Sequence, residues 1–181
     1  MELTEKYLAE QEDCIKRCQE GRNNWRKSKV VKERHKILKN FCKGAETILS
    51  VGSAGLEPIE LNATHAIDVH KLAYDYLIEG GWKGVFVVAS CDEIPYQSRF
   101  FDVAVCQEVI EHLPDLEEVK KTFLELHRVA KNWIVTTPAI KVAEKTHKRV
   151  FDFDMLISTT HEVPCKIERK GRYWYVSHSS D

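Results

Sequence analysis

Four short stretches of the sequence decide its fold: ILSVGSAG (48–55), HAIDV (65–69), VFVVASCDEIPY (85–96) and FFDVAVCQEVIEHL (100–113). Each contains an apolar run that ends in small or acidic residues. Uninterrupted runs such as VFVV indicate strands that are buried on both faces, as in parallel sheets. Because the carboxyl ends of parallel strands meet at one edge of a sheet, the residues after these runs predict a site for a nucleotide-like ligand.

Helical periodicity between the apolar runs completes the pattern. We predict strands at 47–52, 66–69, 85–89, 101–106 and 132–136, and helices at 70–79 and 115–130. Further on, a short helix at 152–158 precedes two strand-like segments, 163–168 and 173–177, around a Lys-Gly turn that predicts an antiparallel hairpin. The alternation predicts an α/β fold: a doubly wound, seven-stranded, mostly parallel sheet that closes with this hairpin.

Two more helices are expected before the first strand, at 3–20 and 28–42. In the second, Val31 and Leu38 belong to an apolar stripe at helical spacing, which predicts that one face packs on the rest of the protein. A chain of 181 residues suits one domain. We therefore predict an N-terminal helical elaboration over residues 1–43 and a ligand-binding, Rossmann-like domain over residues 44–181.

Charge is unevenly distributed, although the net charge of the chain is only −1. Residues 16–43 contain eleven Lys or Arg against two Glu, which gives this segment a net charge of +9. Residues 1–15 carry −4 and residues 44–181 carry −6. A basic segment beside an acidic domain predicts an anionic substrate or RNA as a partner. A solvated helix whose charges face water explains the same pattern.

Neither a membrane segment nor a secretory signal is predicted. No apolar run approaches the ~20 residues that a membrane span requires, and the N-terminus is acidic and amphipathic. The six cysteines lack the spacing of a disulfide scaffold. We therefore expect reduced thiols and a cytoplasmic location, and the oligomeric state stays open.

Small residues occupy the loop after the first strand, where Gly52, Ser53, Ala54 and Gly55 follow one another. Such residues let a ligand approach the backbone closely, and the N-terminus of the following helix favours a carboxylate. Asp68 ends the second strand, where a carboxylate can accept two hydrogen bonds from a ribose diol. A nicotinamide-dependent oxidoreductase would also place glycines and an acid here, but its Gly-x-Gly-x-x-Gly signature is absent. A structural turn is the other explanation.

The segment ASCDEIPYQSRFFDVAVCQEVIEHLPDLEEV (89–119) strongly resembles the class I S-adenosylmethionine-dependent methyltransferases, particularly their small type-11 members. The resemblance lies in Ile94-Pro95, Phe101-Asp102 and Glu111-His112-Leu113, which fall at the spacing of that family. It extends over residues 45–140. The family implies the sheet described above, S-adenosylmethionine as cofactor and methyl transfer as the reaction.

The resemblance also implies which residues bind the cofactor. The first loop would line the methionine moiety, the acid after the second strand would bind the ribose, and residues after the third and fourth strands would border the adenine and the sulfonium. In this chain the implied residues are Gly52, Ser53, Ala54, Gly55, Asp68, Val69, Ser90, Cys91, Cys106 and Gln107. The chain departs from the family at Ser50 and Ser90, where acids are usual, and at Ala54 and Leu56, where glycines are usual.

The predicted function is therefore methyl transfer from S-adenosylmethionine to an acceptor that the sequence leaves open: a small molecule, a protein or RNA. Alignment of donor and acceptor supplies most of the catalysis in such a reaction, so a general base is not required. If a base takes part, His112 is the first candidate and Glu108 the second. A catalytically silent methyltransferase-like module, which binds a partner through its basic N-terminal helices, is an alternative.

A second alternative involves a metal ion. Glu108, Glu111 and His112 recur at helical spacing, and His147 lies downstream. This set resembles the metal ligands of RNA 3′-terminal 2′-O-methyltransferases, in which two Glu and two His hold a divalent ion beside the target hydroxyl. Such an ion would lower the pKa of the hydroxyl and orient it. Many type-11 enzymes, however, contain the same residues without a metal.

Overall fold

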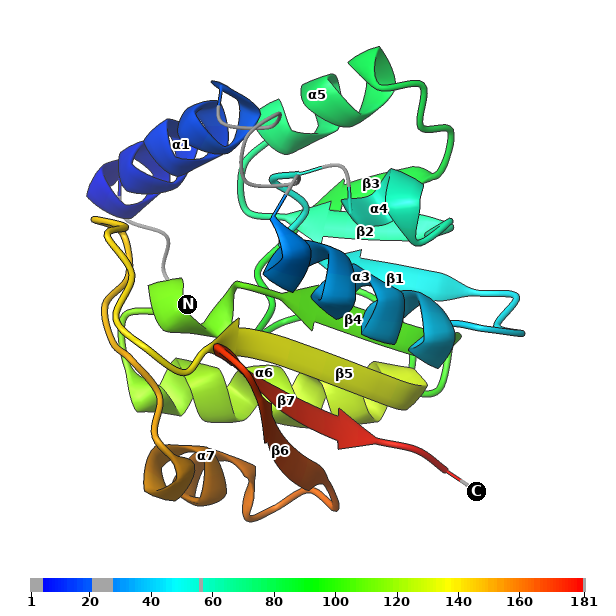
Figure 1. The fold of residues 1–181 in the computed structure, drawn as a ribbon. Coiled ribbons are helices and arrows are strands. Elements are labelled where there is room, and N and C mark those ends of the chain that lie inside the picture. The colour runs from blue at the N-terminus through cyan, green and yellow to red at the C-terminus, as the bar shows by residue number, and fades with distance from the viewer. Residues whose placement is uncertain (1–4, 21–27, 56, 181) are drawn as a thin grey trace.

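The computed structural model describes residues 5–20, 28–55 and 57–180. Its centre is one seven-stranded sheet with the strand order β3-β2-β1-β4-β5-β7-β6 (Figure 1). Strands β1 to β5 are parallel, and β7 is antiparallel to β5 and β6. The predicted doubly wound sheet with an antiparallel C-terminal hairpin is thus confirmed. The strands are β1 (Ile48–Val51), β2 (His65–Asp68), β3 (Val85–Val88), β4 (Phe101–Gln107), β5 (Ala130–Pro138), β6 (Lys166–Lys170) and β7 (Tyr173–His178).

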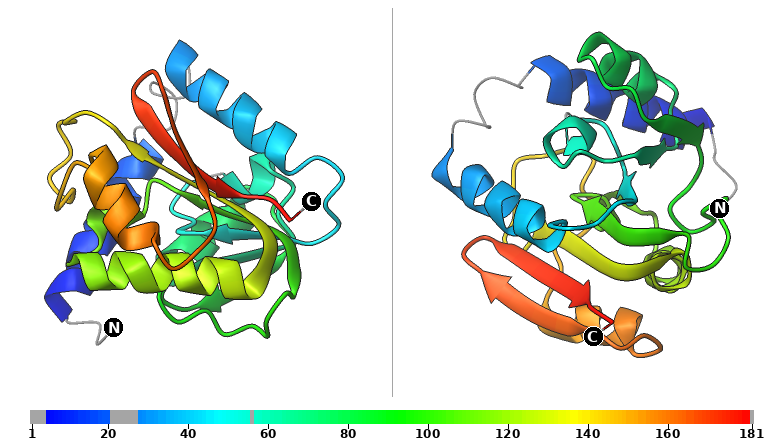
Figure 2. Two further views of the ribbon diagram at one scale, coloured as in Figure 1. Left: turned by 90° about the horizontal axis from the view of Figure 1, so that it is seen from below. Right: turned by 90° about the vertical axis from the view of Figure 1, so that its right-hand side faces the viewer.

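Helices cover both faces of the sheet (Figure 2). α6 (Leu116–Val129) and α7 (Phe153–Thr160) lie on one side, and α3 (Lys29–Phe41) lies on the other. Side chains of β4 alternate between the two sides: Ala104 and Cys106 join the core cluster with α6, whereas Val103 and Val105 join the cluster with α3. Burial on both faces explains why β4 is apolar along almost its whole length.

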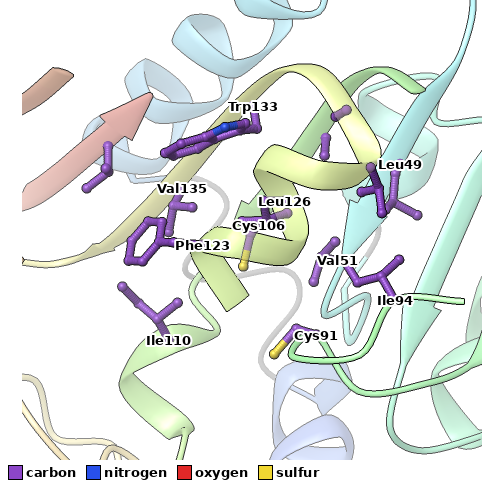
Figure 3. Close-up of a cluster of buried hydrophobic side chains, with 14 of the residues drawn as sticks. Leu49, Val51, Cys91, Ile94, Cys106, Ile110, Phe123, Leu126, Trp133 and Val135 are labelled. Atoms are coloured by element: carbon purple, nitrogen blue, oxygen red, sulfur yellow. The ribbon is translucent and has the colours of Figure 1, made fainter. Parts of the chain in front are cut away.

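The larger core cluster lies between the sheet and α6 (Figure 3). Trp133 of β5 and Phe123 of α6 are fully buried there, with ring centroids 5.7 Å apart. The side chain of Asp115 caps α6, because it accepts a hydrogen bond from the backbone N–H of Glu118 (2.9 Å). The cap and the apolar face together fix α6 behind the strands that carry the candidate site.

The two predicted N-terminal helices are present as α1 (Glu5–Glu20) and α3. α3 begins at its N-cap Ser28 and buries Val31 and Leu38, and Leu38 belongs to the same cluster as strand residues such as Ile48. The helix is therefore an integral part of the folded unit. The boundary between residues 43 and 44 stays a prediction.

α1 lies at the end of the sheet where the parallel strands finish (Figure 1). Two ion pairs connect it to the segment after β5: Glu10 with Lys148 (2.6 Å) and Arg17 with Glu144 (2.8 Å). None of the helices within the described ranges combines the length and apolar character needed to cross a membrane.

Two connections near this end of the sheet are unusually brief. α4 (Glu57–Glu60) follows β1 and has only four residues, so the expected favourable helix N-terminus contributes little there. After α5 (Leu72–Glu79) and β3, residues 89–100 contain no helix. That segment is held by Arg128, which donates to the carbonyls of Ile94 (2.8 Å) and Tyr96 (2.7 Å). A 3-10 turn, η1 (Ile110–His112), follows β4.

Candidate active site

A cavity of about 250 Å³ opens at the carboxyl ends of β1 to β4, and α1 forms part of its wall. Both candidate bases, His112 and Glu108, line it. Ser53 and Cys106 do not, because their side chains are fully buried behind the wall, and their contact with a cofactor stays a prediction. The other residues predicted to bind the cofactor all line the cavity: Gly52, Ala54, Gly55, Asp68, Val69, Ser90, Cys91 and Gln107.

The loop after β1 presents its backbone to the cavity. Gly52 has a φ of +73°, and a Cβ at this position would lie 2.1 Å from Cγ2 of Val109, so only glycine fits. Ser53 turns inward, where its hydroxyl donates to the carbonyl of Ser50 (3.3 Å). The loop therefore presents mainly backbone to the cavity.

Asp68 ends β2 in the cavity wall, with only 8% of its surface exposed. Burial raises the pKa of its carboxyl group to about 6, although backbone N–H groups, including that of His70 at 3.1 Å, oppose this shift. Additional hydrogen bonds donated by a ligand would stabilise the ionised carboxylate, which has lost its hydration. The geometry therefore suits a ribose diol.

The loop after β3 forms the neighbouring wall. Ser90, which stands where the family usually has an acid, donates a hydrogen bond to the carboxylate of Asp92. The thiol of Cys91 accepts a hydrogen bond from Thr122 (3.3 Å), and burial raises its pKa to about 12. Cys91 is therefore a neutral wall residue and not a nucleophile.

Glu108 is held by a buried arginine. Its carboxylate is 3.0 Å from the guanidinium of Arg34, which also lies over the ring of Tyr173 at 4.5 Å. Burial raises the pKa of Glu108 to about 7, and Arg34 opposes the shift. Glu108 has a φ of +55°, a strained backbone conformation for a residue with a side chain. The ion pair and the strained backbone hold this carboxylate at the cavity.

Arg34 is a site residue that sequence reasoning missed. It is 1% exposed and lines the cavity, although it belongs to an N-terminal helix. A signal was present: Arg34 lies three residues after Val31 and four before Leu38, on the buried stripe of α3. A charged residue on such a stripe indicates a buried partner.

Part of the wall comes from α1, which sequence reasoning treated only as an elaboration. The helix contributes Tyr7, Gln11, Cys14 and Ile15. Burial raises the pKa of the Tyr7 phenol well above its ordinary value. No sequence signal identified this contribution, because the position of α1 depends on its contacts with distant segments.

Glu111, His112 and His147 converge beside the cavity, with potential ligand atoms all within 4.8 Å of one another. The rings of His112 and His147 meet edge to face at 4.7 Å, and Nε2 of His147 is 3.9 Å from Oε1 of Glu111. The other Glu111 oxygen accepts from the hydroxyl of Thr137 (3.0 Å). Burial raises the pKa of Glu111 well above its usual range. Three of the four predicted metal ligands thus come together, while Glu108 faces Arg34.

Known proteins share this architecture. Residues 52–133 match the model of a family described as a methyltransferase domain. Among solved structures, the N-methyltransferase NodS from Bradyrhizobium japonicum WM9 in complex with S-adenosyl-L-homocysteine has a TM-score of 0.69 at 16% identity, over 93% of this chain and 97% of its own. No curated protein sequence matches this chain.

Two further solved structures have the same fold. The 1,6-didemethyltoxoflavin-N1-methyltransferase of Burkholderia thailandensis, with bound 1,6-didemethyltoxoflavin and S-adenosylhomocysteine, has a TM-score of 0.64 at 16% identity, over 95% of this chain and 87% of its own. A SAM-dependent methyltransferase from Archaeoglobus fulgidus has a TM-score of 0.65 at 15% identity, over 82% of this chain and 92% of its own.

At these identities the solved structures establish the fold, whereas the family model covers the segment that carries the predicted motifs. The resemblance predicted from the sequence is therefore confirmed. Residues 52–133 thus match a methyltransferase domain, and the chain has the fold of the S-adenosylmethionine-dependent class I methyltransferases.

Proposed function

We propose that the cavity binds S-adenosylmethionine with its ribose on Asp68, its adenine beside Val69, Ser90 and Cys91, and its methionine end along residues 52–55 and Gln107. One observation carries the proposal: residues from four separate loops, predicted independently of the structure, line a single cavity. Gly52 leaves no room for a side chain, and Asp68 offers a buried carboxylate. Both features fit the cofactor.

We further propose an oxygen or nitrogen nucleophile as the methyl acceptor. S-adenosylmethionine supplies a methyl group that is already reactive, so the residues of this chain mainly have to orient the acceptor. Wall residues outside the proposed cofactor contacts, such as Tyr7, His112 and Tyr173, form the acceptor side. Two similar structures are named as N-methyltransferases, and one holds a small heterocycle. A small molecule with a reactive nitrogen is therefore the first acceptor to test.

His112 is the first candidate for a proton acceptor. Burial, together with the neighbouring His147, lowers the pKa of its imidazole to about 4. The ring is therefore neutral at physiological pH and has a free electron pair for a proton of the acceptor. Glu108 is the second candidate, but its carboxylate already forms an ion pair with Arg34, which favours a structural role.

Calorimetric titration with S-adenosylhomocysteine tests the proposed cofactor site. We expect saturable binding by the wild-type protein and at least about tenfold weaker binding by Asp68→Ala, because a lost charge-assisted hydrogen bond costs roughly 1.5–3 kcal/mol. The far-ultraviolet circular dichroism of the variant should be unchanged. Unaltered affinity would remove Asp68 from the site. Absence of heat with wild-type protein at millimolar ligand would favour the catalytically silent module.

The cluster of Glu111, His112 and His147 favours a second candidate function, metal-assisted methylation of a hydroxyl group such as that of RNA. Within the described residues, Oε1 of Glu111 and Nδ1 of His112 are buried without a hydrogen-bond partner, so the cluster fits a divalent ion. The ion would lower the pKa of an acceptor hydroxyl. The exposed lysines of α3 support an anionic acceptor: Lys29, Lys32, Lys36 and Lys39.

Titration with Mn²⁺, followed by electron paramagnetic resonance, tests this candidate without any need for activity. We expect the wild-type protein to bind Mn²⁺ and His147→Ala to lose at least about tenfold in affinity, because one ligand is removed. The exposed His161 provides the matched control, since His161→Ala removes a histidine outside the cluster. A wild-type protein that leaves the Mn²⁺ signal unchanged at millimolar concentration would rule the candidate out.

A cytoplasmic location is also proposed. The five cysteines whose side chains the structure describes are all free: Cys14, Cys42, Cys91, Cys106 and Cys165. Free thiols in such number are typical of a reducing compartment.

A further inference from the structure

Glu57 is a buried carboxylate in the cavity wall, with 7% of its surface exposed. Its Oε1 accepts a hydrogen bond from Nε2 of Gln107 (3.1 Å). An amide carries no net charge, so this contact leaves the negative charge of Glu57 in place. Within the described residues, no Lys or Arg forms an ion pair with Glu57.

Two other carboxylates of the same wall have paired cations, whereas Asp68 accepts hydrogen bonds from backbone N–H groups. Glu108 pairs with Arg34 (3.0 Å), and Glu144 pairs with Arg17 (2.8 Å). Arg34 also experiences the charge of Glu57, but its ion pair is made to Glu108. Burial of a carboxylate without a paired cation is costly. The position of Glu57 in a ligand cavity therefore indicates a ligand that brings a positive charge.

Gln107 adds a second acceptor beside this carboxylate. An ionised carboxylate can only accept hydrogen bonds, so the amide must present its Nε2 to Glu57, and this fixes the amide orientation. Oε1 of Gln107 is then left without a hydrogen-bond partner among the described residues, although the side chain is buried and lines the cavity. The carboxylate and the amide oxygen together match an ammonium group, which has three N–H donors.

The loop after β1 brings this acceptor pair to the proposed methionine end of the cofactor. A Cβ at Gly55 would lie 1.9 Å from Oε2 of Glu57, so the carboxylate packs directly on the loop backbone. Strand β1 (ILSV) contains no charged residue, and the hydroxyl of Ser50 accepts a hydrogen bond from the hydroxyl of Ser53 (3.3 Å). Glu57 provides the negative charge that the strand lacks.

We propose that Glu57 and Gln107 bind the α-ammonium group of the methionine moiety of S-adenosylmethionine. The inference rests on the proposed binding of S-adenosylmethionine in this cavity. That molecule has two cationic groups, the ammonium and the sulfonium. Only the ammonium donates hydrogen bonds, so the unpartnered oxygen of Gln107 selects it.

Three ligands distinguish whether Glu57 and Gln107 recognise the ammonium group or the sulfonium group. S-adenosylhomocysteine keeps the ammonium and lacks the sulfonium, whereas 5′-methylthioadenosine keeps the adenosine and thioether but lacks the amino acid. We expect Glu57→Gln to weaken S-adenosylmethionine and S-adenosylhomocysteine at least about tenfold in calorimetric titrations. Binding of 5′-methylthioadenosine should stay within about twofold of wild type, which also shows that the variant is folded. Asp68→Asn is the matched control and should weaken all three ligands.

Gln107→Leu provides an independent variant, because it removes the amide oxygen and leaves Glu57 in place; we expect the same selective loss. A loss confined to S-adenosylmethionine would assign Glu57 to the sulfonium and overturn the inference. Equal losses of affinity for all three ligands, or no loss for any of them, would also overturn the inference. A wild-type protein that binds none of the ligands would overturn the proposed function together with the inference, whereas wild-type binding with an unaffected Glu57→Gln overturns the inference alone.

Discussion

Asp68 and His112 are both buried in the cavity wall, and burial moves their pKa values in opposite directions, to about 6 for the Asp68 carboxyl group and about 4 for the His112 imidazole. Desolvation penalises the charged form in both cases. At pH 7 the wall therefore presents an ionised carboxylate at Asp68 and a neutral imidazole at His112, the states that the proposed ribose and acceptor contacts require. The charge state of each residue follows from its surroundings in the fold.

The raised pKa of Asp68 predicts that cofactor affinity depends on pH. In the proposed complex, ribose hydroxyl groups donate to the ionised carboxylate, so ligand binding would lower the pKa of Asp68 from about 6 in the free protein. Affinity for S-adenosylhomocysteine should be full above that pH and fall by about tenfold between pH 7 and pH 5, as protonation competes with binding. Calorimetric titrations at these pH values measure the change.

Asp68→Asn supplies the control for this pH dependence. Its side chain does not titrate, so its weaker affinity should vary much less between pH 7 and pH 5. A wild-type affinity that is independent of pH in this range, or a variant with the same slope as wild type, would show that another group controls binding.

At the scale of elements, α6 supports the site from behind. Its buried face packs on the strands whose ends carry the cavity, and Asp115 fixes its first turn by accepting the N–H of Glu118. The sequence predicted this helix well, because one apolar stripe at helical spacing marks its position. It predicted the brief α4 less well, since the length of a helix beside a ligand loop is set by tertiary contacts such as that between Glu57 and Gln107.

Removal of the α6 cap should destabilise the protein. We expect Asp115→Ala to lower the free energy of unfolding by about 0.5–2 kcal/mol, because the N–H of Glu118 loses its acceptor. Urea unfolding measures the difference. Glu117→Ala is the matched control: it removes an exposed acid from the same turn without removing the cap, and should cost distinctly less. Equal effects of the two substitutions would mean that charge and not capping stabilises this helix end.

At the scale of the whole molecule, the doubly wound sheet and the ligand loops at its edge followed from the sequence. Buried parallel strands have continuous apolar runs, and their topology forces the loops that follow to meet at one edge. The contributions of Arg34 and α1 did not follow. Arg34 reaches the cavity because α3 packs on one face of the sheet, and α1 reaches it through ion pairs such as that between Glu10 and Lys148. No local pattern in the sequence specifies partners so distant.

A crystal structure of the protein with S-adenosylhomocysteine would show directly whether this cavity is the cofactor site. We expect one molecule in the cavity, with its ribose hydroxyl groups on the carboxylate of Asp68 and its methionine end on the loop 52–55 beside Glu57. The adenine should lie between Val69 and Ser90. A ligand bound elsewhere, or a cavity filled by side chains with Asp68 turned away from the ribose, would contradict the proposed site.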